Sequence, residues 1–435
     1  MKTLRFFAAW ILGLIVLLSA DTLLAQQTKI DYFRPYDQNG VNVFEAPNES
    51  TVPFDGLAVK IGANFTQQYQ MLKHSNESTL EANALYPLGN GFNLATANLN
   101  INVQLDDGIR VALENYMSSR HHSEFWVKGG YIQIDKLPMF NNPQWFTDLV
   151  RIKIGHMQIN YGDQQFRRTD NGNAIYNPFV GNYIMDAFAT EIGGEVYLFP
   201  TKNITAALGM TAGLIKGDVK DYAPGETSAD RQRKDPSIYL KLAYDNQVSS
   251  DLRLRLSGSL YTNGNTPRNT LYGGDRTGSR FYEVMKLAAE DSPFSGRLNP
   301  GFSNKITAFQ INPFIKFKGL EFFGTYEQSS GKTNAENDTR NATQVAGELI
   351  YRFLPREQAY IGARYNTVTA ELSGVDDKVS IDRTEIAAGW FATKNLLLKL
   401  GYVNQNYTDF PDDESYGKYY NGNFNGMMIE AIIGF

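Results

Sequence analysis

The chain has 435 residues, a formal net charge of −5 and no cysteine. The missing cysteines exclude disulfide scaffolds, thiolate metal sites and cysteine nucleophiles. Four histidines and a pI near 5.6 argue against a multi-histidine metal centre and against a nucleic-acid partner. We therefore expect no cofactor, no metal and no nucleic acid.

Residues 1–25 have the pattern of a secretory signal peptide. Lys2 and Arg5 give a positive start, an apolar run extends from Phe6 to Leu18, and Ala25 offers a cleavage point. The run is shorter than the roughly 18 residues that a membrane-spanning helix needs. Residues 26–56 show no clear periodicity, and we interpret them as an N-terminal periplasmic segment.

From residue 57 onward, apolar and polar side chains alternate in stretches that are typical of strands with two different faces. Sixteen such stretches are predicted: Leu57–Met71, Phe92–Leu105, Ile109–Met117, Phe125–Ile134, Leu149–Ile159, Ala187–Phe199, Ile204–Ile215, Ser237–Asn246, Leu252–Thr262, Lys305–Phe317, Leu320–Gln328, Thr343–Phe353, Gln358–Ala370, Val379–Phe391, Leu396–Tyr407 and Phe424–Phe435.

The links between these stretches alternate in length. Asp106-Asp107-Gly108 and Lys318-Gly319 are short and turn-rich, whereas 160–186 and 263–304 are long and polar. Only the link 135–148 is long where the alternation predicts a short turn. Outer-membrane barrels combine short periplasmic turns with longer external loops. Residues 57–435 are therefore predicted to form an all-β, transmembrane antiparallel β-barrel of about 16 strands in the cell outer membrane.

Many predicted strands have one apolar and one polar face, as where Leu252, Leu254 and Leu256 alternate with Arg253 and Arg255. No helices are predicted that could cover the apolar faces, so we expect lipid to cover them. Aromatic residues near strand ends predict two interfacial girdles: Tyr69, Tyr116, Tyr197, Phe199, Tyr244, Tyr261, Phe317, Tyr351 and Tyr407.

The last stretch alternates through Ile433 and ends on Phe435. It resembles the C-terminal assembly signal of outer-membrane barrels. The chain as a whole resembles a sixteen-stranded Gram-negative outer-membrane porin. The segment YGDQQFRRTDNG (Tyr161–Gly172) resembles the start of the long loop of the phosphate-selective porin family. The resemblance implies passive diffusion of small hydrophilic solutes, homotrimers, and lipid, lipopolysaccharide and the barrel-assembly machinery as partners.

The third long loop, 160–186, is predicted to fold into the lumen and to carry the pore constriction at Asp163, Arg167, Arg168 and Asp170. The small inner-face residues of the predicted strand Ile204–Ile215, from Thr205 to Gly213, are expected to leave room for this loop. The alternative is an external lid whose charges are solvated.

Basic side chains recur on the predicted inner faces near the short turns: Lys60, Arg110, Arg151, Lys153, Arg253, Arg255, Lys316 and Lys399. An excess of one charge sign concentrates counter-ions, so these residues favour anions, including phosphate-like ones. Alternatively, they face headgroups or the periplasm.

Two other functions stay open. Residues 26–56 and the long loops 216–236 and 263–304 could fill a plugged structural or secretion-associated barrel. A barrel hydrolase would need a Ser-His-acid group on its rim. No nucleophile-elbow, zinc-protease or Walker motif occurs, so we expect a porin channel and no enzyme.

Overall fold

The structure is a computed structural model that describes residues 29–215, 219, 234–274, 277–287 and 294–435. The predicted signal peptide, 1–25, and most of the loop 216–236 lie outside the described residues. In the described part, no helix is long and apolar enough to cross a membrane.

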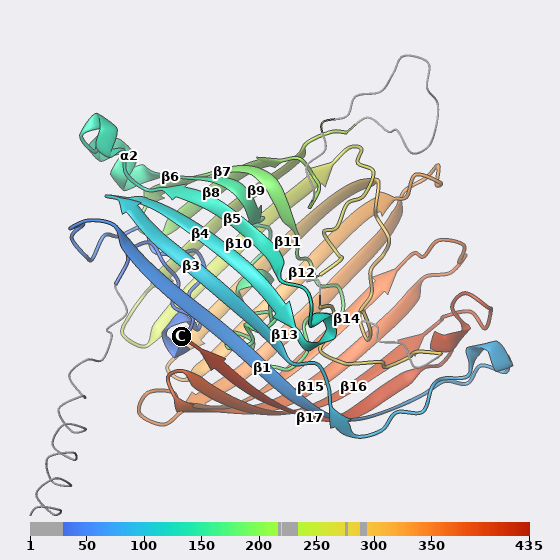
Figure 1. Ribbon diagram of the computed structural model, residues 1–435. Coiled ribbons are helices and arrows are strands. Elements are labelled where there is room, and N and C mark those ends of the chain that lie inside the picture. The colour runs from blue at the N-terminus through green and yellow to red at the C-terminus, as the bar shows by residue number, and fades with distance from the viewer. Residues whose placement is uncertain (1–28, 216–218, 220–233, 275–276, 288–293) are drawn as a thin grey trace, which may run out of the picture.

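Sixteen long antiparallel strands make up the described fold (Figure 1). They are β1 (Ala58–Ser75), β3 (Thr96–Asp106), β4 (Ile109–Ser118), β5 (Trp126–Ile134), β6 (Val150–Gln158), β7 (Thr190–Thr201), β8 (Ile204–Thr211), β9 (Ser237–Gln247), β10 (Leu252–Asn263), β11 (Lys305–Phe317), β12 (Leu320–Lys332), β13 (Arg340–Phe353), β14 (Ala359–Ala370), β15 (Val379–Thr393), β16 (Leu396–Thr408) and β17 (Asn423–Gly434). The two-residue strand β2 (Gly91–Phe92) pairs with β1.

The sheet closes into a barrel because β1 pairs with both β3 and β17. Phe65 lies opposite Ile433 in this closure, and the backbones of Ala63 and Phe435 exchange hydrogen bonds of 3.1 and 3.0 Å. Every other neighbour along the ring is also the neighbour in sequence. Closure leaves no exposed edge strand, which satisfies the backbone groups within a membrane.

All sixteen predicted strands are present, but several extend further toward the long loops than expected. β12 runs to Lys332 and β13 begins at Arg340, and Ser330 pairs with Asn341 there. Both faces are polar in this region, so the alternation that marks a strand in the sequence fades while the hydrogen-bonded ladder continues.

The outer surface carries an apolar belt, with Leu242, Ile361 and Ile386 each more than half exposed. Exposed aromatic side chains border it: Tyr244, Phe317, Tyr351, Trp390 and Phe435 beside the short turns, and Tyr326, Tyr365 and Tyr402 nearer the long loops. An apolar belt between two aromatic girdles on a closed barrel is the arrangement of outer-membrane proteins, so this barrel spans an outer membrane.

Five of the nine aromatic residues expected in the girdles instead point into the lumen. Their side chains are at most 9% exposed: Tyr116, Tyr197, Phe199, Tyr261 and Tyr407. Tyr197 alternates with the exposed Val196 and Leu198, so parity alone puts it inside. Its hydroxyl donates to Glu195 at 2.8 Å, because the lumen offers the polar partner that lipid lacks.

The unusually long link between β5 and β6 contains the short helix α2 (Gln144–Leu149). It projects from the short-turn end of the barrel beside β6, at the upper left of Figure 1. Phe140 and Trp145 of this link are 69% and 62% exposed. The departure from the alternation of loop lengths is therefore real, since the link forms a projecting apolar element instead of a turn.

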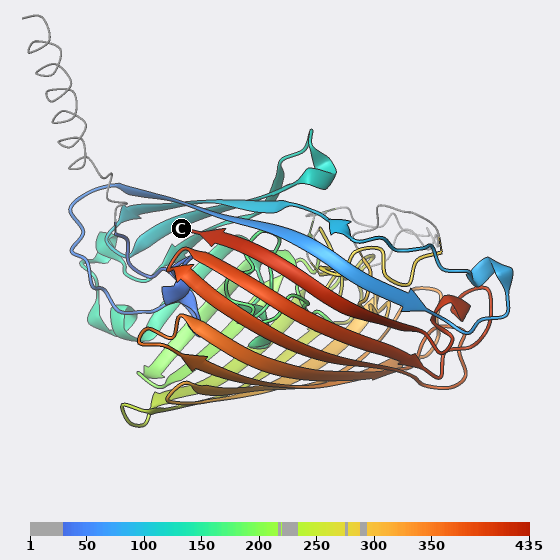
Figure 2. The ribbon, with the colours of Figure 1, turned by 90° about the horizontal axis from the view of Figure 1, so that it is seen from below.

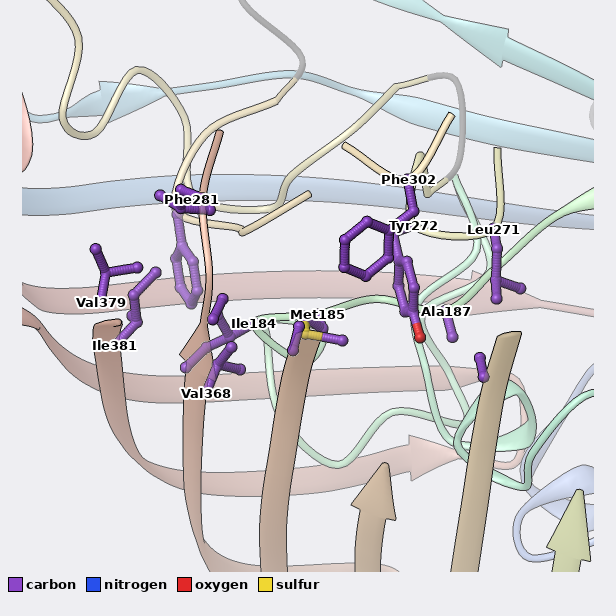
Figure 3. Packing of buried hydrophobic residues seen from close by; sticks show 14 of the residues in the cluster. Ile184, Met185, Ala187, Leu271, Tyr272, Phe281, Phe302, Val368, Val379 and Ile381 are labelled. Carbon is purple, nitrogen blue, oxygen red and sulfur yellow. The ribbon is translucent and has the colours of Figure 1, made fainter. Parts of the chain in front are cut away.

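Segments of the chain also fill the inside of the ring. Near the long loops, Ile184 and Met185 pack with Leu271 and Phe302 from the β10–β11 loop, and with Val368 of β14 (Figure 3). At the opposite end, residues 29–56 gather where the C-terminus lies (Figure 2). The lumen is therefore largely occupied, and solute can pass only where these segments leave space.

Candidate functional site

The residues 159–189 between β6 and β7, hereafter the third loop, lie inside the barrel. Of these residues, Asp163, Arg167 and Arg168 are 0%, 1% and 2% exposed. The predicted inward fold is confirmed, and the external-lid alternative is wrong.

One anchor holds the start of the third loop to β9, β10 and β11. The Asp163 carboxylate accepts from Arg255 at 2.8 Å and contacts Lys241 Nζ at 2.7 Å, while its N–H donates to Asn312 Oδ1 at 2.8 Å. Burial disfavours the charged carboxylate, but Arg255 and Lys241 outweigh that effect and hold the pKa of Asp163 below its usual range.

A second set of anchors holds the loop to β13, β14 and β15. Arg167 donates to Glu348 at 3.0 Å, and its guanidinium also donates to Asn42. Arg364 bridges Glu348 and Glu385 at 2.8 and 3.0 Å. It also donates to the Gly181 carbonyl at 2.8 Å. These buried cations each have carboxylate partners, so they serve as ties between loop and wall.

The third loop also contacts β1 and β3, on the side of the barrel away from these anchors. Thr66 donates to the Gly172 carbonyl at 2.7 Å, and Asn171 donates to the Ala97 carbonyl at 2.7 Å. A Cβ on Gly172 would lie 2.5 Å from the Cα of Ala97, so only glycine allows this approach. The third loop therefore spans the lumen and divides it.

A polar cavity of about 190 Å³ remains between the third loop and the wall formed by β3 to β7. Residues 33–46 close its end toward the short turns. Its lining contains six cationic side chains and three carboxylates: Arg34, Arg110, Lys128, Arg151, Lys153 and Arg168, against Glu45, Glu114 and Asp170. Three of these cations also have carboxylate partners behind the lining, because Asp135, Glu195 and Asp186 pair with Arg151, Lys153 and Arg168. The side chains that face the cavity itself therefore have an excess of cations.

The cationic side chains of the wall lie at successive levels between the short turns and the long loops. Arg110 and Arg151 lie near the short turns, Lys153 is next along β6, and Lys128 of β5 is nearest the long loops. Lys128 Nζ contacts Glu114 at 3.0 Å and Asp170 at 2.6 Å. An anion moving along this wall would meet a basic side chain at each level.

Lys128 lies at the end of the cavity nearest the long loops. It also lines a smaller void of about 20 Å³, together with Tyr116, Phe188, Thr270 and others on the long-loop side. The Tyr116 hydroxyl donates to Asp170 beside it. Lys128 lies between these two spaces and is 8% exposed, so water screens its charge less than it screens charges in the open mouth.

Residues 29–56 separate the cavity from the mouth at the short-turn end of the barrel. Phe33, Arg34, Phe44 and Ala46 line the cavity. Gln38, Asn39, Val41 and Asn42 line the mouth, a space of about 740 Å³. Arg34 lies 3.6 Å over the ring of Tyr176 and donates to the Phe166 carbonyl at 2.9 Å, which ties the segment to the third loop. The periplasmic assignment of this segment stays a prediction, and its contacts inside the lumen place it where the plugged-barrel alternative expects it.

The four predicted constriction residues divide into two pairs. Arg168 and Asp170 line the cavity. Asp163 and Arg167 do not line it, because each is bound to the opposite wall. Arg168 forms a bidentate pair with Asp186 at 2.8 and 2.7 Å. A role in constriction stays a prediction for all four.

The eight predicted basic residues of the lumen fall into groups according to what each side chain contacts or lines. Arg110, Arg151 and Lys153 line the cavity, and Arg253 and Lys316 line the mouth. Arg255 and Lys399 are ties to the third loop, and Lys60 lies 5.4 Å from the Phe33 ring.

Two cavity cations were missed by the sequence analysis. Arg34 belongs to a segment that shows no periodicity. Lys128 lies beside a bulge at Glu114/Asn115 and next to Gly129 and Gly130, where the alternation of faces is interrupted. The presence of a lysine in an otherwise apolar stretch was the available signal.

The small residues of β8 were expected to make room for the third loop. At Gly209 the room is taken by Tyr239 of β9, whose ring would lie 2.0 Å from a Cβ at that position. The Tyr239 hydroxyl donates to Glu195 at 2.8 Å. The explanation was therefore wrong at this residue, because a neighbouring aromatic side chain fills the space.

No protein-family model matches the chain, and no curated protein matches its sequence. The structure resembles the anion-selective porin from Comamonas acidovorans, with a TM-score of 0.53 and 10% identity over 87% of this chain and 100% of that one. It also resembles the outer-membrane channel DcaP of Acinetobacter baumannii, with a TM-score of 0.50 and 10% identity over 87% and 98% of the two chains. At this identity the likeness shows the fold.

Proposed function

We propose that the protein is an outer-membrane porin that passes small hydrophilic anions through the cavity beside the third loop. One observation carries the proposal: six cationic side chains and three carboxylates line that cavity. Charges on a narrow, low-dielectric wall shift the local concentration of permeant ions. The excess favours anions over cations of similar size.

The chemistry of the wall suits oxyanions. Arg110 contributes a guanidinium group, which matches carboxylate and phosphate geometry, and Lys153 and Lys128 act as point charges. Arg151 also lines the cavity, but its guanidinium is tied to Asp135 and to two backbone carbonyls. Phosphate-like solutes are the class that the resemblance of Tyr161–Gly172 implies. The anion-selective porin of similar fold supports an anionic solute, and trimers and the assembly machinery stay predictions.

A plugged barrel is the second candidate. Residues 29–56 close the cavity toward the periplasm, and the described part of the β10–β11 loop packs across the other end. A stable plug would leave no continuous water path. Catalysis is not proposed. His74, for example, contacts the Tyr86 carbonyl and accepts from the N–H of Met285.

Planar-bilayer recording of the purified full-length protein separates these candidates. A channel gives discrete conductance steps, and its reversal potential in a salt gradient has the sign of anion preference. The variant Lys128→Gln/Lys153→Gln should shift that potential toward cations. Absence of any conductance, also after Arg34→Ala/Phe44→Ala loosens the N-terminal segment, would support the plugged scaffold and overturn the porin.

A further inference from the structure

The N-terminal segment places one carboxylate on a pair of lumen cations. Glu45 Oε2 lies 2.8 Å from Arg255 and Oε1 lies 3.0 Å from Lys241 Nζ. The amide of Asn160 donates to Oε1 at 3.4 Å. Glu45 belongs to the segment at the mouth, whereas its three partners belong to the wall and the third loop. A mouth residue thus completes a polar cluster inside the lumen.

The charges around Glu45 balance only while it is present. Asp163 contacts the same two cations at 2.7 and 2.8 Å. Asp245 contacts Arg255 at 3.3 Å and pairs with Arg253 at 2.6 Å. Three cations therefore face three carboxylates, and removal of Glu45 leaves a net charge of +1.

The two cations are too enclosed for water to replace the missing carboxylate well. Lys241 and Arg255 are 3% and 4% exposed. Asp163 stays on both cations when Glu45 leaves, but a buried cluster with one uncompensated positive charge is unfavourable. The segment is therefore most easily displaced when another anion takes the place of Glu45.

Glu45 also lies at the boundary between cavity and mouth. Phe44, Glu45 and Ala46 line the cavity, and Asn42 lines the mouth. Arg151 donates to the Ala46 and Pro47 carbonyls at 2.7 Å each, so this stretch crosses the lumen as its floor. Displacement of residues 44–46 would join the two spaces.

We infer that Arg255 and Lys241 form a binding site for a small oxyanion, which Glu45 occupies as a tethered competitor. A carboxylate or phosphate that enters the cavity replaces Glu45 on these cations and opens the floor. This inference rests on the proposed porin function and adds a second, anion-dependent state to it.

The state of Glu45 at neutral pH fits this role. Burial disfavours its charge, but Arg255 and Lys241 outweigh burial and lower the pKa of Glu45 to about 2. The competitor stays charged near neutrality, so the occupancy of the site depends on anion concentration and not on pH there.

Conductance tests this inference with inorganic phosphate as the probe, at constant ionic strength and pH 7. Wild-type conductance should rise several-fold with phosphate. Glu45→Gln keeps the shape but removes the charge, so it should start at the raised level and respond little to phosphate. The matched control is Glu49→Gln, an exposed residue of the same segment, which should behave as wild type.

A second measurement does not depend on conductance. The chain has no cysteine, so Ala46→Cys introduces a single thiol at the cavity floor. Phosphate should increase its modification rate by a charged maleimide, and Glu45→Gln in the same background should make the rate high without phosphate. A phosphate-independent rate and an unchanged Glu45→Gln conductance would overturn the inference and leave the porin intact. Failure of every variant to conduct would instead overturn the porin.

Discussion

Basic side chains have different roles on the two sides of the lumen, the side formed by β9 to β17 and the side formed by β3 to β7. Along β9 to β17, arginines and lysines face the third loop and nearly balance with carboxylates, as Arg364 does with Glu348 and Glu385. Around the cavity that β3 to β7 border, the lining holds six cations and three carboxylates, and Arg110 donates to the amide oxygens of Asn102 and Gln133 instead of to a carboxylate. The comparison teaches that the balance of partners, and not the number of basic residues, separates a tie from a surface that meets solute.

The largest effect is expected on the packed side. Arg364→Leu leaves the Glu348 and Glu385 carboxylates buried with fewer partners, which should lower the free energy of unfolding by about 3–5 kcal/mol. The temperature at which the folded band disappears on a heat-modifiability gel measures this loss. The control is Arg356→Leu at the mouth, an exposed arginine that should leave the temperature unchanged. Equal stability of both variants would mean that this tie does not hold the loop.

A smaller loss is expected where a tyrosine covers a strand glycine. A Cβ on Gly389 would lie 2.1 Å from the Tyr360 ring, and one on Gly209 would lie 2.0 Å from Tyr239. Gly389→Ala and Gly209→Ala should each lower the free energy of unfolding by about 1–3 kcal/mol through overpacking. Gly258→Ala, with nothing within 4 Å, is the neutral control in the same heat-modifiability assay.

The variants Gly209→Ala and Gly389→Ala also test whether the two sides of the lumen act independently. The Tyr360 hydroxyl donates to the Pro178 carbonyl of the third loop, whereas the Tyr239 hydroxyl donates to Glu195, the partner of Lys153. Only Gly209→Ala should therefore also change the reversal potential. An equal change in both variants would argue that the two sides are not independent.

The third effect concerns selectivity on the cavity side. Lys128→Gln leaves Glu114 and Asp170 without their shared cation, so the permeability ratio should shift toward cations. A unit charge at 4 Å in water contributes about 1 kcal/mol, or roughly a fivefold change in ratio. Arg253→Gln in the wide mouth should shift it less, because salt screens charges beyond about 8 Å. A larger shift from Arg253→Gln would move the selective region to the mouth.

The sequence predicted the barrel well because lipid imposes a regular alternation on each strand. It predicted the interior less well, since inside the lumen both polar and aromatic residues face one another. Arg167 and Arg168 are adjacent in sequence and carry the same charge, yet Arg167 binds Glu348 of the opposite wall and Arg168 lines the cavity. Only the path of the third loop separates them, and no local pattern encodes that path.

The N-terminal segment illustrates the same limit. Arg34 and Glu45 lie in a stretch without periodicity, and their partners, Tyr176 and Arg255, are more than 100 residues away. Long-range ion pairs and ring contacts produce no recognisable sequence pattern around either of the two partner residues. The plugged-barrel alternative does name residues 26–56 as filling material, and residues of this segment line the cavity, but the plug itself stays a prediction.

The smallest effect is expected from acid at the pair Arg168–Asp186, which joins two stretches of the third loop where Arg168 lines the cavity. Burial disfavours the Asp186 charge, but Arg168 outweighs it and holds the pKa of Asp186 below its usual 3.8. A lowered pKa means that the pair stabilises the fold above pH 3.8 and loses that contribution as the pH falls through the lowered value. The heat-modifiability temperature of the wild type should thus fall between pH 5 and strongly acidic conditions more than that of Asp186→Asn. Equal slopes would show that the Arg168–Asp186 pair contributes little to the stability of the fold, because other carboxylates, such as Asp163, titrate in both proteins.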